Sequence, residues 1–285
     1  MIIVVVHSIL KSISDNLENK GTSKIAYYVE YILIVTLVMA NFSEMVTMIK
    51  TAITNIIGYM NTLVPILLAL IMTTGNVVTA NLLQPTILFS IVFIGNAITL
   101  IILPITFVAT ILGILSNLSD KVQIGKLSKF LKSGITWVLG FVITIFVSVL
   151  SLEGGLTSSV DGITIKGLKS ASSTFIPVVG KALGDSVDTV LGATSVIKNA
   201  VGVVGIIMVV GICAIPIIKL TVITVIYHFT AAISEPLADK KIVEVIEQMA
   251  GTFKVLLGIM FFVAVLFIIG LAMTLKISNA GIMYR

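Results

Sequence analysis

The sequence predicts an all-α protein, a polytopic transmembrane helical bundle with about six to seven spans, kinked or broken helices and amphipathic interfacial helices. Of the 285 residues, 58% are apolar and only 11% are charged, less than half of the share of about 25% in soluble domains. The mean hydropathy is +1.18. So few charges could not cover the surface of a soluble domain of this size. We therefore expect residues 1–285 to form a single integral membrane domain.

The first part of the chain predicts an interfacial helix followed by two spans. Apolar residues recur at helical spacing within residues 1–24, but the apolar run is too short to cross a membrane, so we expect an amphipathic helix at the interface. Apolar runs at residues 25–42 and 53–74 predict the first two spans, the second with Pro65 inside it. Glu30 stands in the first turns of its span, either as an acid at the interface or as a functional intramembrane carboxylate.

The third span, at residues 86–115, is too long for one straight crossing. As a helix its 30 residues would measure about 45 Å, against roughly 30 Å of hydrocarbon. Asn96 and Pro104 interrupt the run, so we expect a kinked or broken helix there. The two residues form a polar, kinked face that suits either helix packing or a cavity.

The segment 116–133 predicts a cytoplasmic polar loop, because four lysines stand in it against a single acid, Asp120. The fourth span follows at residues 134–152. Counting three spans back from the loop places the N-terminus outside. Residues 153–198 are expected on the far side of the membrane, as a polar loop followed by a Gly-rich amphipathic or re-entrant helix.

Small residues recur at every fourth position of that Gly-rich helix, and residues four apart share a helical face. This spacing lets two backbones approach closely. A second smooth surface follows at the start of the next apolar run. The predicted assembly face comprises Gly180, Gly184, Asp188, Gly192, Gly202 and Gly205. We interpret it either as an interfacial helix that packs on the bundle for stability or as a close-packed or re-entrant element lining a protein–protein contact or a pore.

Residues 199–233 form one apolar run that contains Pro216 and Lys219. The run is long for one crossing and short for two, so a single crossing and a re-entrant pair both stay open, and with them the side of the C-terminus. A lysine at mid-membrane is costly unless it faces water, a partner or an acid. A bend at Pro216 would bring Lys219 to an aqueous edge. The last span is predicted at residues 252–275.

The sequence lacks the patterns that common membrane enzymes and motors need. It contains no GxxxxGK[ST] phosphate loop, no GxSxG nucleophile motif and no histidine–cysteine spacing typical of a zinc site. We expect no enzymatic activity, no metal and no cofactor. The 18 basic residues against 13 acidic ones indicate topology and contact with anionic lipids of the bilayer, not nucleic-acid binding.

The stretch "STFIPVVGKALGDSVDTVLGATSVIKNAVGVVGI" resembles the signature of the stage III sporulation protein AE family of endospore-forming bacteria. The similarity continues through "AIPIIKL", "AAISEPLAD" and the tail ending in "MYR", and it covers "KIAYYVEYILIV" and "LEGGLTSSVDGITIKGLKSA". It therefore spans nearly the whole chain. Members of the family usually carry a signal-like segment and an extra region before the point at which this chain starts.

This resemblance implies a polytopic subunit of a multiprotein, secretion-like complex in the mother-cell membrane around the forespore. The implied partners are other membrane subunits, including a separate ATPase and ring-forming proteins, and the implied role is a platform or conduit for transport between the two cells. The alternative is a stand-alone secondary permease for a small solute. A permease should show paired, repeat-related broken helices, and we see no such repeat in the sequence.

Overall fold

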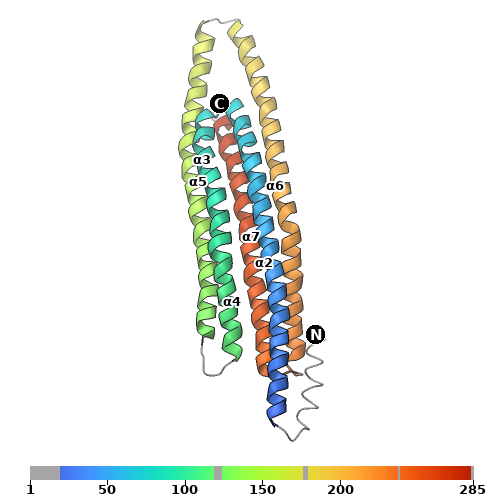
Figure 1. Cartoon of the computed structure of the whole chain (residues 1–285). Helices are drawn as coiled ribbons and strands as arrows, with labels where there is room; N and C mark the ends of the chain where they lie inside the picture. The colour runs from blue at the N-terminus through green and yellow to red at the C-terminus, as the bar shows by residue number, and fades with distance from the viewer. Residues whose placement is uncertain (1–19, 119–123, 176–178, 237, 284–285) are drawn as a thin grey trace. The chain divides into compact units, whose positions relative to one another are not determined.

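The computed structural model is helical along the part of the chain that it describes, which confirms the all-α prediction. It describes residues 20–118, 124–175, 179–236 and 238–283, without the side chains of 20–27, 30, 118, 157–160, 162–175, 179–188 and 280–283. The helices are α2 (Lys20–Thr73), α3 (Val77–Ala97), a π-helix (Ile98–Ile102), α4 (Leu103–Leu118), α5 (Gly125–Phe175), α6 (Val179–Ser234) and α7 (Lys240–Met283) (Figure 1). Residues 1–19 of the expected interfacial helix lie outside the described residues.

Five helical stretches within the described residues are long and apolar enough to cross a membrane. They are Tyr31–Thr73, Val77–Asn117, Gly125–Leu156, Thr189–Ser234 and Lys240–Asn279. Each contains a stretch without any charged residue: residues 51–73, 77–118, 134–152, 199–218 and 255–275. Four of these stretches match the length of about 20 residues that one crossing needs. The helices are therefore compatible with a multi-pass membrane protein.

The span count is lower than the predicted six to seven because residues 25–42 and 53–74 belong to one continuous helix, α2. The charges at positions 44 and 50 interrupt the apolar run, but both side chains are exposed. On the opposite face, buried Phe42, Met45, Ile49 and Ile53 continue the spacing of three to four residues that keeps one helical face against the core. The interval is amphipathic helix and not a connection between two spans.

Two segments expected as polar loops are also helical. Helix α5 begins at Gly125, inside the predicted loop 116–133, and continues to Phe175 through the stretch expected as the loop of residues 153–198. The local sequence lacks an apolar run there, but contacts with other helices support it. Gly154 is buried against Ile277 of α7, and Asp161 accepts hydrogen bonds from the start of α3. Hydropathy detects the part of a helix that lies in lipid and not its continuation beyond lipid.

The predicted proline kinks have different outcomes. Pro65 and Pro216 lie inside the unbroken helices α2 and α6, so residues 199–233 form one helix and not a re-entrant pair. Before Pro104 the backbone does change: a π-helix occupies Ile98–Ile102, and the Leu103 N–H donates to the carbonyl of Ile98. A proline ring clashes with the carbonyl four residues earlier, and a π turn changes the local hydrogen-bonding pattern. The helical hydrogen-bonding pattern therefore changes just before Pro104, and the kink expected there stays a prediction.

The connection between α2 and α3 shows why a glycine is needed at position 75. Gly75 has a φ of 85°, in the left-handed region that suits glycine. Its N–H donates to the Met72 carbonyl, and the Asn76 N–H donates to the Ile71 carbonyl. This pair of bonds is the Schellman arrangement, which satisfies the last carbonyls of a helix. It ends α2 and reverses the chain within three residues.

The chain divides into two compact units. Unit 1 comprises residues 1–51, 97–139 and 215–261, and unit 2 comprises residues 52–96, 140–214 and 262–285. Two aromatic pairs connect the core of unit 1 to its surface: the ring centroids of buried Phe42 and exposed Phe107 are 5.9 Å apart, and those of half-buried Tyr227 and buried Phe253 are 4.9 Å apart. The core of unit 2 is mainly aliphatic, although Phe146 and Phe267 are also buried in it. Its buried residues include Ile56, Met60, Leu67, Ile71, Leu83, Ile87, Val209, Val263 and Leu271.

Candidate functional site

A polar cavity of about 660 Å³ lies in unit 1 between the end of α4, the start of α5 and the first turns of α7. Three lysines, two glutamates and the side-chain amides of Asn117 and Gln248 contribute to its wall. The amides are linked, because Asn117 Nδ2 donates to Gln248 Oε1 at 3.1 Å and Gln248 Nε2 donates to Ser128 Oγ at 3.4 Å. The Ser128 hydroxyl donates to the Ala109 carbonyl at 2.6 Å. The wall is therefore held by hydrogen bonds that connect all three helices.

Lys132 lines this cavity and is half-buried. Its Nζ donates to Thr252 Oγ1 at 2.7 Å and to the Gln248 carbonyl at 3.4 Å. The lysine stands two residues before the charge-free stretch 134–152 of α5. Its position fixes an ammonium group at the edge of the apolar part of unit 1.

A second polar cluster lies in unit 2, around Lys198 of α6. The Lys198 side chain is fully buried, and its Nζ donates to Ser278 Oγ and to Asn279 Oδ1, both at 2.7 Å. Asn279 Nδ2 in turn donates to Asn199 Oδ1 at 3.2 Å. Asn76 joins the cluster from the α2–α3 turn by donating to the Ser278 carbonyl at 3.2 Å. A buried charge is costly unless it is paired and hydrogen-bonded, and here polar groups of α7 supply the bonds.

Asp161 of α5 caps the start of α3 from a distant part of the sequence. The carboxylate is almost completely buried, and it accepts hydrogen bonds from the Val78 N–H at 3.0 Å and the Thr79 N–H at 2.9 Å. The first N–H groups of a helix have no intrahelical partner, and the helix dipole favours an anion at this end. Asp161 thus stabilises α3 and ties α5 to it.

Lys219 lies near an acid, as the sequence analysis required of a lysine inside an apolar run. Its Nζ is 4.0 Å from Glu44 Oε1 of α2, and the side chains are 56% and 66% exposed. Lys219 is also the first residue after the charge-free stretch 199–218 of α6. Residues 220–234 also lack Asp, Glu, Lys and Arg, so the pair lies within the apolar run of α6 and not at its end.

The residues of the predicted assembly face have different surroundings. Gly180, Gly184 and Asp188 lie in α6, but their side-chain surroundings are outside the described residues. Gly192 is exposed, and a methyl group placed on it would meet no atom within 4 Å among the described residues. Buried Gly202 and Gly205 instead face Leu275 and Leu63, neighbours within unit 2. The assembly role of the face stays a prediction.

The remaining predicted positions lie apart from both polar clusters. Asn96 is exposed at the end of α3, Pro65 and Pro104 are exposed, and Pro216 is buried. Glu30 lies in α2, and its side chain is outside the described residues.

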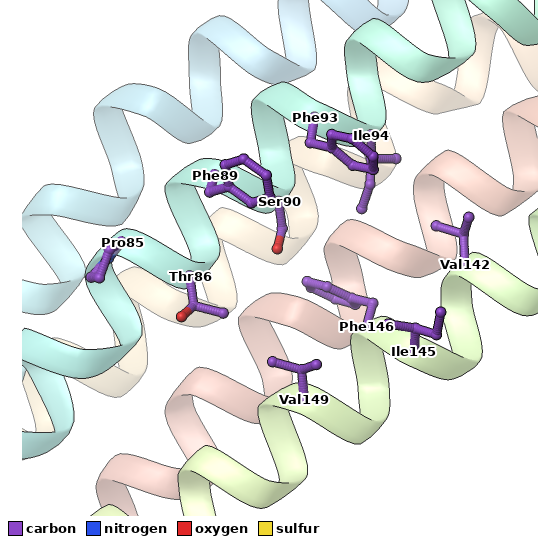
Figure 2. A pocket seen from close by; sticks show the side chains of 10 residues that line it. All are labelled: Pro85, Thr86, Phe89, Ser90, Phe93, Ile94, Val142, Ile145, Phe146 and Val149. Atoms are coloured by element: carbon purple, nitrogen blue, oxygen red, sulfur yellow. The ribbon is translucent and has the colours of Figure 1, made fainter.

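An apolar groove of about 590 Å³ lies between α3 and α5 of unit 2 (Figure 2). Phe89 and Phe93 line it from α3 with their rings stacked at a centroid distance of 5.5 Å. Phe146 and Val149 face them from α5. Next to the groove, Thr86 Oγ1 donates to Glu153 Oε1 at 2.7 Å. The two aromatic side chains are largely exposed, as expected for a surface that meets acyl chains.

The most strongly held charges are residues that the sequence analysis did not select. Lys132 enters the sequence argument only as one of the four lysines of segment 116–133, and Lys198 does not enter it. Asp161 and Glu44 were not considered. A signal for Lys198 was present, because Lys198 and Lys219 flank the charge-free stretch 199–218. The two lysines are less apparent when residues 199–233 are described as one apolar run.

Together these features define a class: a helical membrane protein with five candidate spans and hydrogen-bonded charges at the ends of its apolar stretches. Comparison with known proteins identifies the family. The profile described as "Stage III sporulation protein AE" matches residues 1–278, and the chain belongs to this family. The stage III sporulation protein AE of Bacillus subtilis (strain 168) is 28% identical over 277 residues, which cover 97% of this chain and 69% of that protein. No solved structure matches the chain. Family membership confirms the resemblance and supports a role in sporulation.

Proposed function

We propose that this chain is a membrane-embedded platform or conduit subunit of a mother-cell-to-forespore transport complex, and that it is not an enzyme. Its partners would be other membrane subunits, including a separate ATPase and ring-forming proteins, in the mother-cell membrane around the forespore. The observation that best supports a platform is the length of α5 and α6 beyond the polar cluster of unit 2.

Helix α5 continues from Asp161 to Phe175, and α6 begins at Val179, well before Lys198. At 1.5 Å per residue these segments extend about 21 Å and about 28 Å beyond the two buried charges. Figure 1 shows both helices continuing past the α2–α3 connection. A helical extension of this length on a membrane bundle offers a docking surface outside the bilayer.

The described part of this extension carries side chains that suit a protein contact. Val190, Val196 and Ile197 are 64%, 69% and 55% exposed, and Gly192 leaves open space beside them. Exposed apolar groups next to a small residue let another helix approach closely. This arrangement supports the second interpretation of the glycine face, a protein–protein contact.

We also propose a revised orientation. If each of the five candidate spans crosses once, two crossings and not three precede the loop 116–133. The start of α2 would then share the cytoplasmic side with that loop, opposite to the sequence-based expectation. The extension of α5 and α6 and the end of α7 would lie on the other side, in the space between the two cells.

The test compares three glycine-to-leucine variants of α6 in a sporulating cell. Gly192→Leu should abolish co-purification with the other membrane subunits and reduce sporulation, while the protein still inserts. Gly211→Leu is the matched control, because Gly211 is also exposed with open space around it but lies in the charge-free stretch. Gly202→Leu should instead lower the stability of the chain itself through its clash with Leu275.

Normal co-purification and normal sporulation with Gly192→Leu would contradict the platform proposal. Uptake of a small solute by the purified chain alone in liposomes would support the permease alternative. Loss of both insertion and co-purification in Gly192→Leu, but not in Gly211→Leu, would mean that the open face packs within this chain.

A further inference from the structure

The polar cavity of unit 1 has an excess of positive charge. Lys126, Lys129 and Lys132 line it, against Glu244 and Glu247. One of the acids is already engaged, because Glu244 Oε1 is 3.8 Å from the Nζ of Lys240. Lys126 and Lys129 are exposed at the rim and have no ion-pair partner in the part of the chain that the structure describes. An anion at the rim would meet two ammonium groups that form no ion pair with a carboxylate of the described residues.

The position of the two rim lysines adds to this attraction. Gly125 and Lys126 are the first two residues of α5 and line the cavity. The N-terminal end of a helix carries a partial positive charge that favours phosphate and other anions. The helix end and the lysines therefore act on the same part of the cavity.

The opposite wall offers groups that bind hydroxyls. Asn117 and Gln248 present amides that are fixed by their mutual hydrogen bond, and exposed Glu247 presents a carboxylate on the first turns of α7. Amides both donate and accept, and a carboxylate accepts hydrogen bonds from hydroxyl groups. A ligand that combines a phosphate with free hydroxyls would match both walls.

An apolar surface leads away from the cavity along the same helix. Leu127, Phe130 and Trp137 of α5 are 47%, 70% and 78% exposed, and their spacing of three and seven residues places them along one face. Trp137 stands near the start of the charge-free stretch 134–152, where interfacial tryptophans are enriched. A molecule with its polar end in the cavity would lie with its apolar part along this face.

We propose that the cavity binds the phosphate ester of a polyol, as presented by the headgroup of phosphatidylglycerol. Lys126 and Lys129 contact the phosphate, and Asn117, Gln248 and Glu247 contact the glycerol hydroxyls. The acyl chains lie along the apolar face of α5. This site does not depend on the transport role proposed above. It assigns a ligand to the end of the bundle that carries the basic loop.

The experiment uses the full chain in nanodiscs of phosphatidylcholine, with and without phosphatidylglycerol, and native mass spectrometry to count retained anionic lipid. A lysine near a membrane surface contributes about a fivefold gain in affinity for anionic lipid. The double variant Lys126→Gln/Lys129→Gln should therefore retain phosphatidylglycerol about 30-fold more weakly. In the control variant Lys50→Gln/Lys254→Gln, which removes two exposed lysines of unit 1 outside the cavity wall, the change should stay below about fivefold.

Two further measurements separate the parts of the proposal. Glycerol 3-phosphate added to the protein in phosphatidylcholine nanodiscs tests a soluble source of the same chemistry. If glycerol 3-phosphate binds in a way that depends on Lys126 and Lys129, and phosphatidylglycerol is not retained, the site binds the free phosphate ester and not the lipid. Glu247→Ala should reduce the preference for phosphatidylglycerol over phosphatidic acid. An unchanged preference would contradict the proposed contact between Glu247 and the glycerol hydroxyls. If the cavity variant and the control variant weaken the retention of phosphatidylglycerol equally, or if neither weakens it, the proposal that the cavity binds this lipid is wrong.

Discussion

Lys198 allows a direct test of how unit 2 holds a buried charge. Its ammonium group is fully buried and donates to Ser278 and Asn279 at 2.7 Å each. Hydrogen bonds to a charged group are worth about 1.5–3 kcal/mol each. The two bonds therefore contribute about 3–6 kcal/mol, which offsets the cost of removing the ammonium from water.

Three variants differ in which side of the hydrogen bonds between Lys198 and α7 they remove. Ser278→Ala/Asn279→Ala keeps the ammonium and removes both acceptors, so it should cost about 3–5 kcal/mol of unfolding free energy. Lys198→Met removes the ammonium and leaves Ser278 and Asn279 without this donor. The Ser278 hydroxyl can rotate toward another partner, so the variant should cost about 1–3 kcal/mol. The triple variant should cost less than the sum of the other two, because the ammonium and the two acceptors that it engages are removed together.

The assay is the free energy of unfolding in mixed micelles, measured by titration with SDS and followed by the helical circular dichroism signal. Lys276→Met is the control, because Lys276 belongs to the same unit but is exposed, and its effect should be close to zero. Additive costs in the triple variant would refute the reasoning, since they would mean that Lys198 does not act through Ser278 and Asn279.

Three other perturbations have definite expected outcomes. Asp161→Ala should lower the unfolding free energy by about 2–4 kcal/mol and Asp161→Asn by less, because the first removes both acceptors of the α3 N–H groups and the second keeps one; the same SDS titration measures both. Lys219→Ala should change the unfolding free energy by less than about 1 kcal/mol, since its pair with Glu44 is largely exposed; a loss of several kcal/mol would place the pair in lipid. In a Cys213→Ala background, cysteines at exposed Lys126 and Thr189 should react with an impermeant maleimide from opposite sides of the membrane; labelling from the same side would contradict five single crossings.

The helical class and the approximate number of spans could be predicted because hydropathy responds directly to burial in lipid. The boundaries could not, since each helix continues beyond its apolar stretch. Residues 153–175 illustrate this point: they contain no apolar run, yet they are helical because Gly154 and Asp161 contact α7 and α3. Such contacts join residues far apart in the sequence, and no local pattern reveals them.

The candidate site was predicted only in part for the same reason. The need of Lys219 for an acid followed from its position alone, but the acid itself, Glu44, stands 175 positions earlier. The hydrogen bonds of Lys132 and Lys198 likewise depend on acceptors in α7, a helix that contributes residues to both units. A single sequence shows that a charge needs a partner, and the packing of the helices supplies it.

The two lysines that flank the charge-free stretch of α6 have a joint consequence for the glycine face. Lys198 is held by neutral acceptors at one end, and Lys219 stands near an acid at the other. A shift of α6 by one turn, about 5.4 Å, would break the bonds of Lys198 or draw one lysine into hydrocarbon. The hydrogen bonds of Lys198 therefore oppose such a shift of α6. Gly192 lies six residues before Lys198, about 9 Å along the helix and outside the charge-free stretch. If Lys198 marks the edge of the hydrocarbon, a partner that meets the glycine face approaches it from the aqueous or headgroup region.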